Sequence, residues 1–119
     1  MAKLITYTLR IPPFTDDEYP ILHTFQTFRA DNGNVLYTVD GEDVTKDEGN
    51  DKFKKWCVGK KAEKNIVEQD MSDTEIKSYL FNSMDQSIEL ITDYTQYEEA
   101  RQHNVQIMNT LHAFEQIAG

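Results

Sequence analysis

The sequence predicts an α+β fold, in which a small antiparallel β-sheet is covered by a C-terminal αα-hairpin and one short helix. Two observations support this fold: β-prone segments separated by turn signals fill residues 1–41, and residues 72–118 carry apolar side chains at helical spacing. A sheet with one apolar face needs a cover, which the helical hairpin supplies. A length of 119 residues fits a single domain, with the short helix at 50–62.

Residues 3–11, KLITYTLRI, form the first expected strand. Every second residue from position 5 to position 11 is apolar or aromatic, and the residues between them are polar. This alternation is typical of a half-buried strand. Pro12 and Pro13 end it, because proline cannot donate a ladder hydrogen bond.

Residues 14–30 allow two interpretations. A capping box at residues 15–18 favours a helix, but Pro20 would break its second turn. The following Thr- and Phe-rich segment favours a strand, and Asn32-Gly33 between two β-prone runs is typical of a hairpin. We therefore expect strands at 21–29 and 34–39, with a second turn at Asp40-Gly41, and three strands in total.

The middle of the chain is more polar. Residues 42–51 are acidic and are expected to form a surface loop. Asn50 is a suitable N-cap for the short helix, which would carry Phe53 and Trp56 on one side. Residues 65–68 form either a fourth strand or a connector.

Residues 72–118 show the clearest helical pattern. A capping box runs from Ser72 to Glu75, and apolar residues follow at helical spacing. A second capping box begins at Thr95, so a break between two helices is expected near 92–95. One continuous helix stays open as the alternative.

The last expected helix carries a heptad seam, with apolar residues in steps of three and four from Tyr97 to Ala118. Asn104 is its one polar member. An Asn in such a seam can set register and oligomeric state, so one hypothesis is self-association through Asn104. The other, which we favour, is a local hydrogen bond, because short helices in a globular domain rarely form a coiled coil.

The charge of the chain is unevenly distributed. The formal net charge is −9, yet six of the twelve Lys and Arg lie within residues 52–64, and acids dominate the chain on both sides. A strongly acidic chain repels nucleic acid and favours basic partners. The balance therefore predicts a basic protein partner and no direct nucleic-acid contact.

The second half of the chain is expected to carry an acidic binding face. On a helical wheel of 100° per residue, four acids from Glu75 to Asp93 fall within an arc of about 80°. Like charges at this spacing cost helix stability, and acids interleaved with Tyr suit a protein interface, although a plain solvated face is the alternative. The predicted partner-binding residues are Glu75, Asp85, Glu89, Asp93, Tyr94, Tyr97, Glu98 and Glu99.

The basic segment 52–64 also has two interpretations. Phe53 and Trp56 could stack bases while the lysines bind phosphates, but the acidic net charge opposes that use. Acids precede the expected helix and lysines follow it, which matches the helix dipole. We therefore favour a packing helix that could also pair with a second copy. The predicted self-association residues are Phe53, Trp56, Lys60, Lys61 and Asn104.

No catalytic, metal or nucleotide motif is recognisable. Cys57 has no His at a known spacing and is expected to be a small buried residue. Glu99 and His103 share a helix face, but a zinc site needs further ligands. We expect no enzymatic activity, no cofactor and no metal. A single Cys and the lack of a long apolar run predict a cytoplasmic protein, in the host cytoplasm if the chain is viral, without membrane contact.

These features predict a non-enzymatic acidic protein-binding module: an inhibitor or nucleic-acid mimic that docks on the basic surface of a nucleic-acid-handling protein. In size and charge alone, the chain is similar to small acidic proteins of phages and mobile elements, including DNA mimics and anti-CRISPR proteins, and no residue motif carries that comparison. The alternative is a small structural or assembly subunit that self-associates, as a homodimer for instance, through its C-terminal helices.

Overall fold

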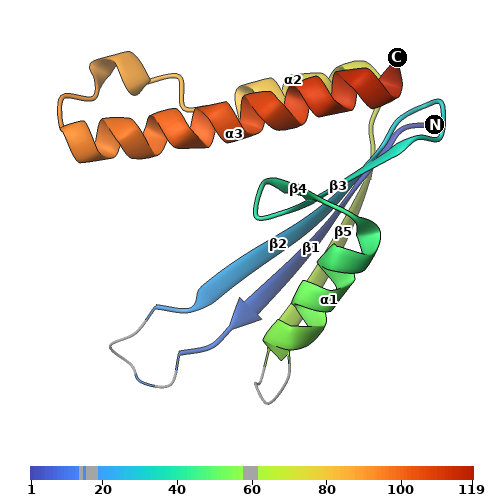
Figure 1. The fold of residues 1–119 in the computed structure, drawn as a ribbon, viewed down its shortest axis with the longest axis horizontal. Helices are drawn as coiled ribbons and strands as arrows, with labels where there is room; N and C mark the ends of the chain where they lie inside the picture. Colours follow the sequence, from blue (N-terminus) through green and yellow to red (C-terminus); the bar gives the residue numbers. More distant parts are fainter. Residues whose placement is uncertain (14, 16–18, 58–61) are drawn as a thin grey trace.

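The computed structural model describes residues 1–13, 15, 19–57 and 62–119. The fold is α+β, as predicted, with a five-stranded antiparallel sheet between helices (Figure 1). The strands lie in the order β4-β3-β2-β1-β5. The elements are β1 (Lys3–Ile11), β2 (Ile21–Arg29), β3 (Val35–Val39), β4 (Glu42–Val44), α1 (Lys46–Cys57), β5 (Glu63–Asp70), α2 (Asp73–Asn82), the 3₁₀ turn η1 (Ile88–Leu90) and α3 (Tyr94–Ala118).

The sheet has more strands than the three or four expected. The first three strands lie where the sequence predicts them, and Gly33 in the turn between β2 and β3 adopts a φ of 88°, which favours glycine. The two edge strands account for the difference. β4 has three residues and lies in the expected loop, whereas β5 extends well beyond residues 65–68 at both ends because its charged flanks conceal the strand pattern.

The prediction of a surface loop at residues 42–51 is wrong. Glu42–Val44 pairs with β3, and α1 begins before position 50. The backbone N–H of Glu48 donates to the hydroxyl of Thr45 at 3.2 Å, which is an N-cap contact. Thr45 and Glu48 have the spacing of a capping box, a signal hidden within an acidic, polar stretch.

The expected break between the last two helices is confirmed, and the continuous helix is excluded. α2 ends at Asn82, earlier than expected, because the carboxylate of Asp85 accepts the N–H of Ser87 at 2.9 Å and so forms a turn that competes with the helix. α3 begins after Asp93, whose carboxylate accepts the N–H of Gln96 at 3.0 Å.

The main hydrophobic core lies between one face of the sheet and the pair α2–α3. Leu4 of β1 and Phe28 of β2 are cross-strand partners on this face and are fully buried. Phe28 packs against Phe114 of α3 with ring centroids 6.4 Å apart. The core cluster comprises Ala2, Leu4, Phe28, Ala30, Ile76, Leu80, Leu111 and Phe114.

The helix α1 covers the opposite face of the sheet. Phe25 of β2 is the centre of this layer, and Phe53 of α1 meets it edge to face at 5.5 Å. Gly49 is buried in α1 directly over Phe25, so closely that a Cβ atom at this position would overlap the aromatic ring. Both faces of the sheet are therefore covered, each over part of its length.

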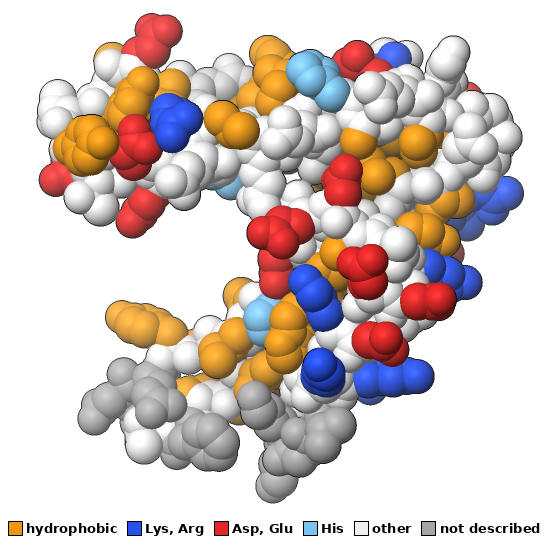
Figure 2. Space-filling model, viewed as in Figure 1, with side chains coloured by type: hydrophobic (Ala, Val, Ile, Leu, Met, Phe, Trp, Pro, Cys, Tyr) orange, Lys and Arg blue, Asp and Glu red, His pale blue; other side chains and the backbone are white. Residues whose placement is uncertain are grey.

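The N-terminal half of α3 and the segment before it extend beyond the sheet (Figure 1). We call residues 83–105 the arm. Figure 2 shows an open notch between the arm and the distal end of the sheet. This shape places the arm in solvent on several sides, although its base is part of the main core.

Candidate protein-binding site

The arm consists of the N-terminal half of α3 and the loop 83–93, which folds back along that helix. The side-chain amide of Asn104 accepts the backbone N–H of Asp85 at 2.7 Å and donates to the carbonyl of the same residue at 3.0 Å. The imidazole of His103 donates from Nε2 to the carbonyl of Ser83 at 3.0 Å. These three contacts fix the segment between α2 and α3 against the helix, so the arm has a defined shape.

The prediction that Asn104 makes a local hydrogen bond, which the sequence favoured over self-association, is confirmed. Both polar groups of its side chain are engaged within the chain, on the backbone of Asp85. Its role in self-association stays a prediction, without a free polar group to support it.

Replacing Asn104 with alanine is expected to destabilise the protein by about 1–2 kcal/mol, because two backbone groups of Asp85 lose their partner in a half-buried position. Urea denaturation measures this free energy of unfolding. Asn109→Ala, an exposed position on the same helix, is the matched control and should change stability by less than about 0.5 kcal/mol. Equal effects of the two substitutions would contradict the assigned role.

Half of the predicted partner-binding residues have structural roles as acceptors or ion-pair partners. Such acids stabilise turns and helix starts, so their presence needs no partner to explain it. Glu75, Asp85 and Asp93 accept the backbone N–H groups of Ser72, Ser87 and Gln96, and Glu98 pairs with Arg101 at 3.1 Å.

The helical wheel that groups these acids assumes a continuous helix, and this premise is wrong because residues 83–93 are not α-helical. Glu75 lies in the first turn of α2, near the β2–β3 turn, and outside the arm. The other seven predicted residues, from Asp85 to Glu99, all lie on the arm. The structure thus brings most of the predicted set together, but at the end of an arm rather than along one helix face.

The pKa of Asp85 is lowered, first by the hydrogen bond from the Ser87 hydroxyl, then by the Ser87 N–H and the nearby His103. A depressed folded-state pKa means that the carboxylate stabilises this turn above its ordinary value of 3.8. The contribution is lost as the pH falls through the lowered value. The arm is therefore held in its full set of contacts at neutral pH.

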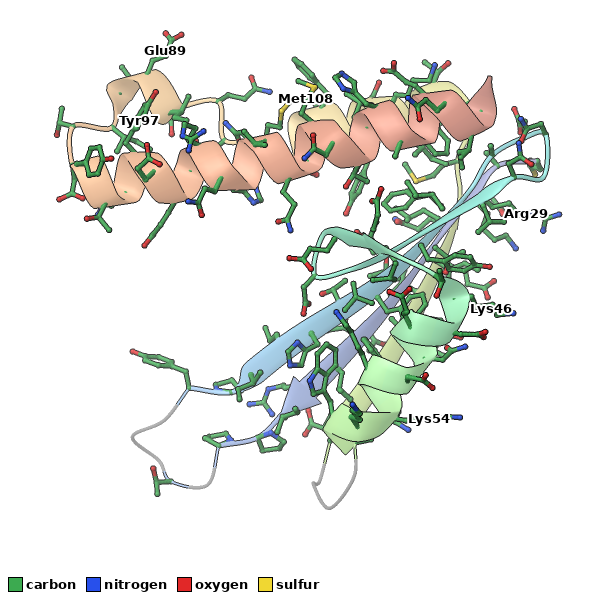
Figure 3. The ribbon with its side chains drawn as sticks, in the orientation of Figure 1. Arg29, Lys46, Lys54, Glu89, Tyr97 and Met108 are labelled. Carbon is green, nitrogen blue, oxygen red and sulfur yellow. The ribbon has the colours of Figure 1, made fainter. Side chains whose placement is uncertain are left out.

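The end of the arm exposes apolar and aromatic side chains among acids. Leu90 is 81% exposed, and Tyr94 and Tyr97 are also exposed. Glu89 and Glu99 are exposed on the same arm, and neither makes a hydrogen bond or an ion pair with the described residues. Glu99 follows Tyr97 by two positions in α3, about 200° around the helix, and it lines the groove. Figure 3 shows Glu89 and Tyr97 at the end of the arm, away from the sheet. Exposed apolar groups ringed by polar ones are typical of a protein interface.

A groove of about 780 Å³ lies between the arm and the β3–β4 turn, and a smaller one of about 320 Å³ continues toward the sheet. Glu42, Asp43 and Glu99 line the larger groove together with a single cation among its described residues, Arg101. Burial raises the pKa of Asp43. Glu42 and Asp43 are functional candidates that the sequence did not identify, because it placed them in an isolated loop.

Only the first part of the basic segment, residues 52–57, is a packing helix as favoured. The expected helix end at 62 is wrong, because α1 ends at Cys57 and Lys64 belongs to β5, and residues 58–61 lie outside the described residues. Trp56 lies flat on the imidazole of His23 with ring centroids 3.6 Å apart, and Phe53 packs on β2. Lys54, labelled in Figure 3, points away from the sheet. The two aromatic rings proposed for self-association are thus engaged within the chain. Lys60 and Lys61 lie outside the described residues, and a role in self-association stays a prediction for all of them.

His23 is placed by contacts that sequence spacing did not reveal. Its Nδ1 donates to the carboxylate of Asp40 at 2.8 Å, and Asp40 also accepts the N–H of Thr24 at 2.9 Å. Asp40 has a φ of 51°, an uncommon value for a residue other than glycine. This cluster holds the turn between β3 and β4, which forms one wall of the groove.

Within the described ranges, no three His, Cys, Asp or Glu side chains gather as a metal site would require. No described helix is both long enough and apolar enough to cross a membrane. The chain matches no protein-family model, and neither the curated proteins nor the solved structures contain a significant match.

Proposed function

We propose that this protein is a non-enzymatic binding module that docks its acidic arm on the basic surface of a nucleic-acid-handling protein. The single observation that carries the proposal is the exposure of Leu90, Tyr94 and Tyr97 on an arm that also carries the exposed acids Glu89 and Glu99. The apolar groups supply contact area, and the acids select a partner of opposite charge.

The charge around the arm favours a partner that otherwise binds nucleic acid. Carboxylates can take the place of phosphates in a basic groove, since both accept hydrogen bonds from Arg and Lys. Figure 2 shows acidic side chains around the end of the arm and at the notch. With a net charge of −9, the whole chain adds long-range attraction toward a basic protein. The module would act as an inhibitor or nucleic-acid mimic.

The structure gives less support to the alternative, a subunit that assembles through its C-terminal helices. Leu111 and Phe114 of the heptad seam are buried against the sheet and α2, so the C-terminal half of the seam is occupied within the chain. A binding module therefore remains the function that we propose.

The double substitution Glu89→Lys/Glu99→Lys tests this proposal. Neither side chain has a structural contact in the described part of the protein, so the fold should be retained while the arm loses its acidic character. With the chain as bait in a host lysate, the wild type should enrich a basic nucleic-acid-binding protein that the variant does not. Duplex DNA and raised salt should each displace that protein.

The matched control is Asp51→Lys/Glu115→Lys, at two exposed positions away from the arm. It changes the net charge by the same amount, so it separates a local docking face from a general charge effect. Equal loss of capture by both variants would contradict docking through the arm. Capture that duplex DNA leaves unchanged would contradict the nucleic-acid-mimic part of the proposal.

A further inference from the structure

The strand β5 forms an exposed edge of the sheet. It pairs with β1 through eight consecutive residues, without a bulge and without proline. All eight of its residues are exposed, including Ile66 and Val67. A long, regular edge strand of this kind is a template for pairing with another strand, unless the protein covers or disrupts it.

The hydrogen-bonding direction of β5 follows from one contact at its end. The N–H of Met71 donates to the carbonyl of Ala2 at 3.2 Å, so this pair is a hydrogen-bonded pair of the β1–β5 ladder. Such pairs alternate along an antiparallel ladder. Every second residue before Met71 therefore faces β1, and the residues between them direct their N–H and C=O groups to the free edge. The outward-directed residues are Lys64, Ile66, Glu68 and Asp70.

The side chains of these four residues share the sheet face that carries α1, because Ile66 is the cross-strand partner of Tyr7 and Tyr7 packs on Phe25. In a twofold dimer with antiparallel β5 strands, the same faces meet on the same side of the joined sheet. Outward-directed residues can therefore pair with one another across the joint.

The charge along this edge is balanced, unlike that of the chain as a whole. β5 and the adjacent side of β1 carry three cations and three acids. Lys3 lies 3.6 Å from Glu68, and Arg10 lies 3.4 Å from Glu63. Two copies of a chain with a net charge of −9 repel each other in general, so a locally neutral edge is the favourable place for them to meet.

We propose that β5 pairs in antiparallel fashion with β5 of a second copy, with Ile66 opposite Ile66 of that copy. This register places Lys64 opposite Glu68 of the second copy, and the twofold axis repeats the ion pair. It joins two sheets of five strands into one of ten. An apolar pair flanked by two complementary ion pairs is favourable across antiparallel strands.

The dimer goes beyond the proposed function and does not depend on it. α3 contacts β3 and β4, near the opposite edge of the sheet, so pairing through β5 leaves both arms free. A single strand joint has a small area, and we expect a weak dimer that forms at micromolar to millimolar concentration. Two arms on one dimer would raise the avidity for a repeated basic surface.

Two complementary charge reversals test the register. In Lys64→Glu, the introduced glutamate faces Glu68 of the second copy, and in Glu68→Lys the introduced lysine faces Lys64. Each variant alone should dimerise at least ~10-fold more weakly than the wild type in sedimentation equilibrium, because like charges then oppose each other twice. Mixed in equal amounts, the two variants should form a heterodimer about as stable as the wild-type dimer, since both ion pairs are restored.

The matched control is Asp70→Lys alone, a reversal on the same edge that this register places opposite neither residue 64 nor residue 68. It keeps both Lys64–Glu68 pairs, so it should dimerise about as strongly as the wild type, and a weakening equal to that of Glu68→Lys would overturn the register. A wild-type chain that stays monomeric up to about 1 mM would overturn the dimer itself. Circular dichroism on each variant confirms that loss of association is not loss of folding.

Discussion

Phe114→Ala should remove about 3–5 kcal/mol from the free energy of unfolding. Phe114 is fully buried and joins α3 to Phe28 at the centre of the main core. Truncation removes its apolar area and leaves a cavity that the sheet and α2 cannot close. Total stabilities are commonly 5–15 kcal/mol, so the loss would leave the fold marginal.

Thermal and urea unfolding, followed by circular dichroism, measure this loss. His112→Ala, at an exposed position on the same helix, is the control and should change stability by less than about 0.5 kcal/mol. Because the base of the arm is held by this core, Phe114→Ala should also weaken partner capture at temperatures where the fold melts. A loss below about 1 kcal/mol would contradict the packing of α3 on the sheet.

Gly49→Ala should destabilise the protein by about 2 kcal/mol, although alanine normally favours a helix. The added Cβ would overlap the ring of Phe25, and such overpacking costs about 1–3 kcal/mol. The higher helix propensity of alanine offsets at most about 1 kcal/mol of this cost. The severe overlap places the steric cost near the upper end of the overpacking range. The sign of the change in unfolding free energy tests whether Gly49 is buried, because replacing a solvent-exposed glycine of α1 with alanine would stabilise the protein.

A double-mutant cycle with Phe25→Leu locates the clash. The smaller side chain leaves room for the Cβ, so Gly49→Ala should cost at least about 1 kcal/mol less in that background than in the wild type. Asn50→Ala, at the next and exposed position of α1, is the control and should be neutral or slightly stabilising. Additive effects of Phe25→Leu and Gly49→Ala would contradict the close approach of helix and sheet.

Local chemistry explains which elements could be predicted. β1 shows the alternation of a strand, Asn32-Gly33 supplies the turn between β2 and β3, and a capping box marks the start of α2 at Ser72. Each of these signals acts between residues close in sequence. These signals can therefore be recognised without knowing which surface of the folded chain each element packs against.

The missed elements lack such local signals or have them masked. β5 is stabilised by its ladder with β1, more than fifty positions away in sequence, and its charged residues resemble those of a connector. The helical pattern beyond Asn82 fails because Asp85 and Ser87 form a turn, which Asn104 then holds from α3. A helical wheel assumes that those residues are helical, so it does not show that the Asp85–Ser87 turn competes with the helix.

The sequence alone determined the α+β class, the first three strands, the break before α3 and the acidic character of the second half of the chain. These properties follow from side-chain periodicity, capping and charge, which act locally or by composition. Only the tertiary structure decided that Asp85 and Asp93 stabilise backbone groups while Glu89 and Glu99 are free of contacts with the described residues, and that Glu42 and Asp43 face the arm. The reason is physical: a hydrogen bond from a backbone N–H engages a carboxylate in the protein's own turns and helix ends, and which carboxylates are engaged in this way depends on the folded neighbours.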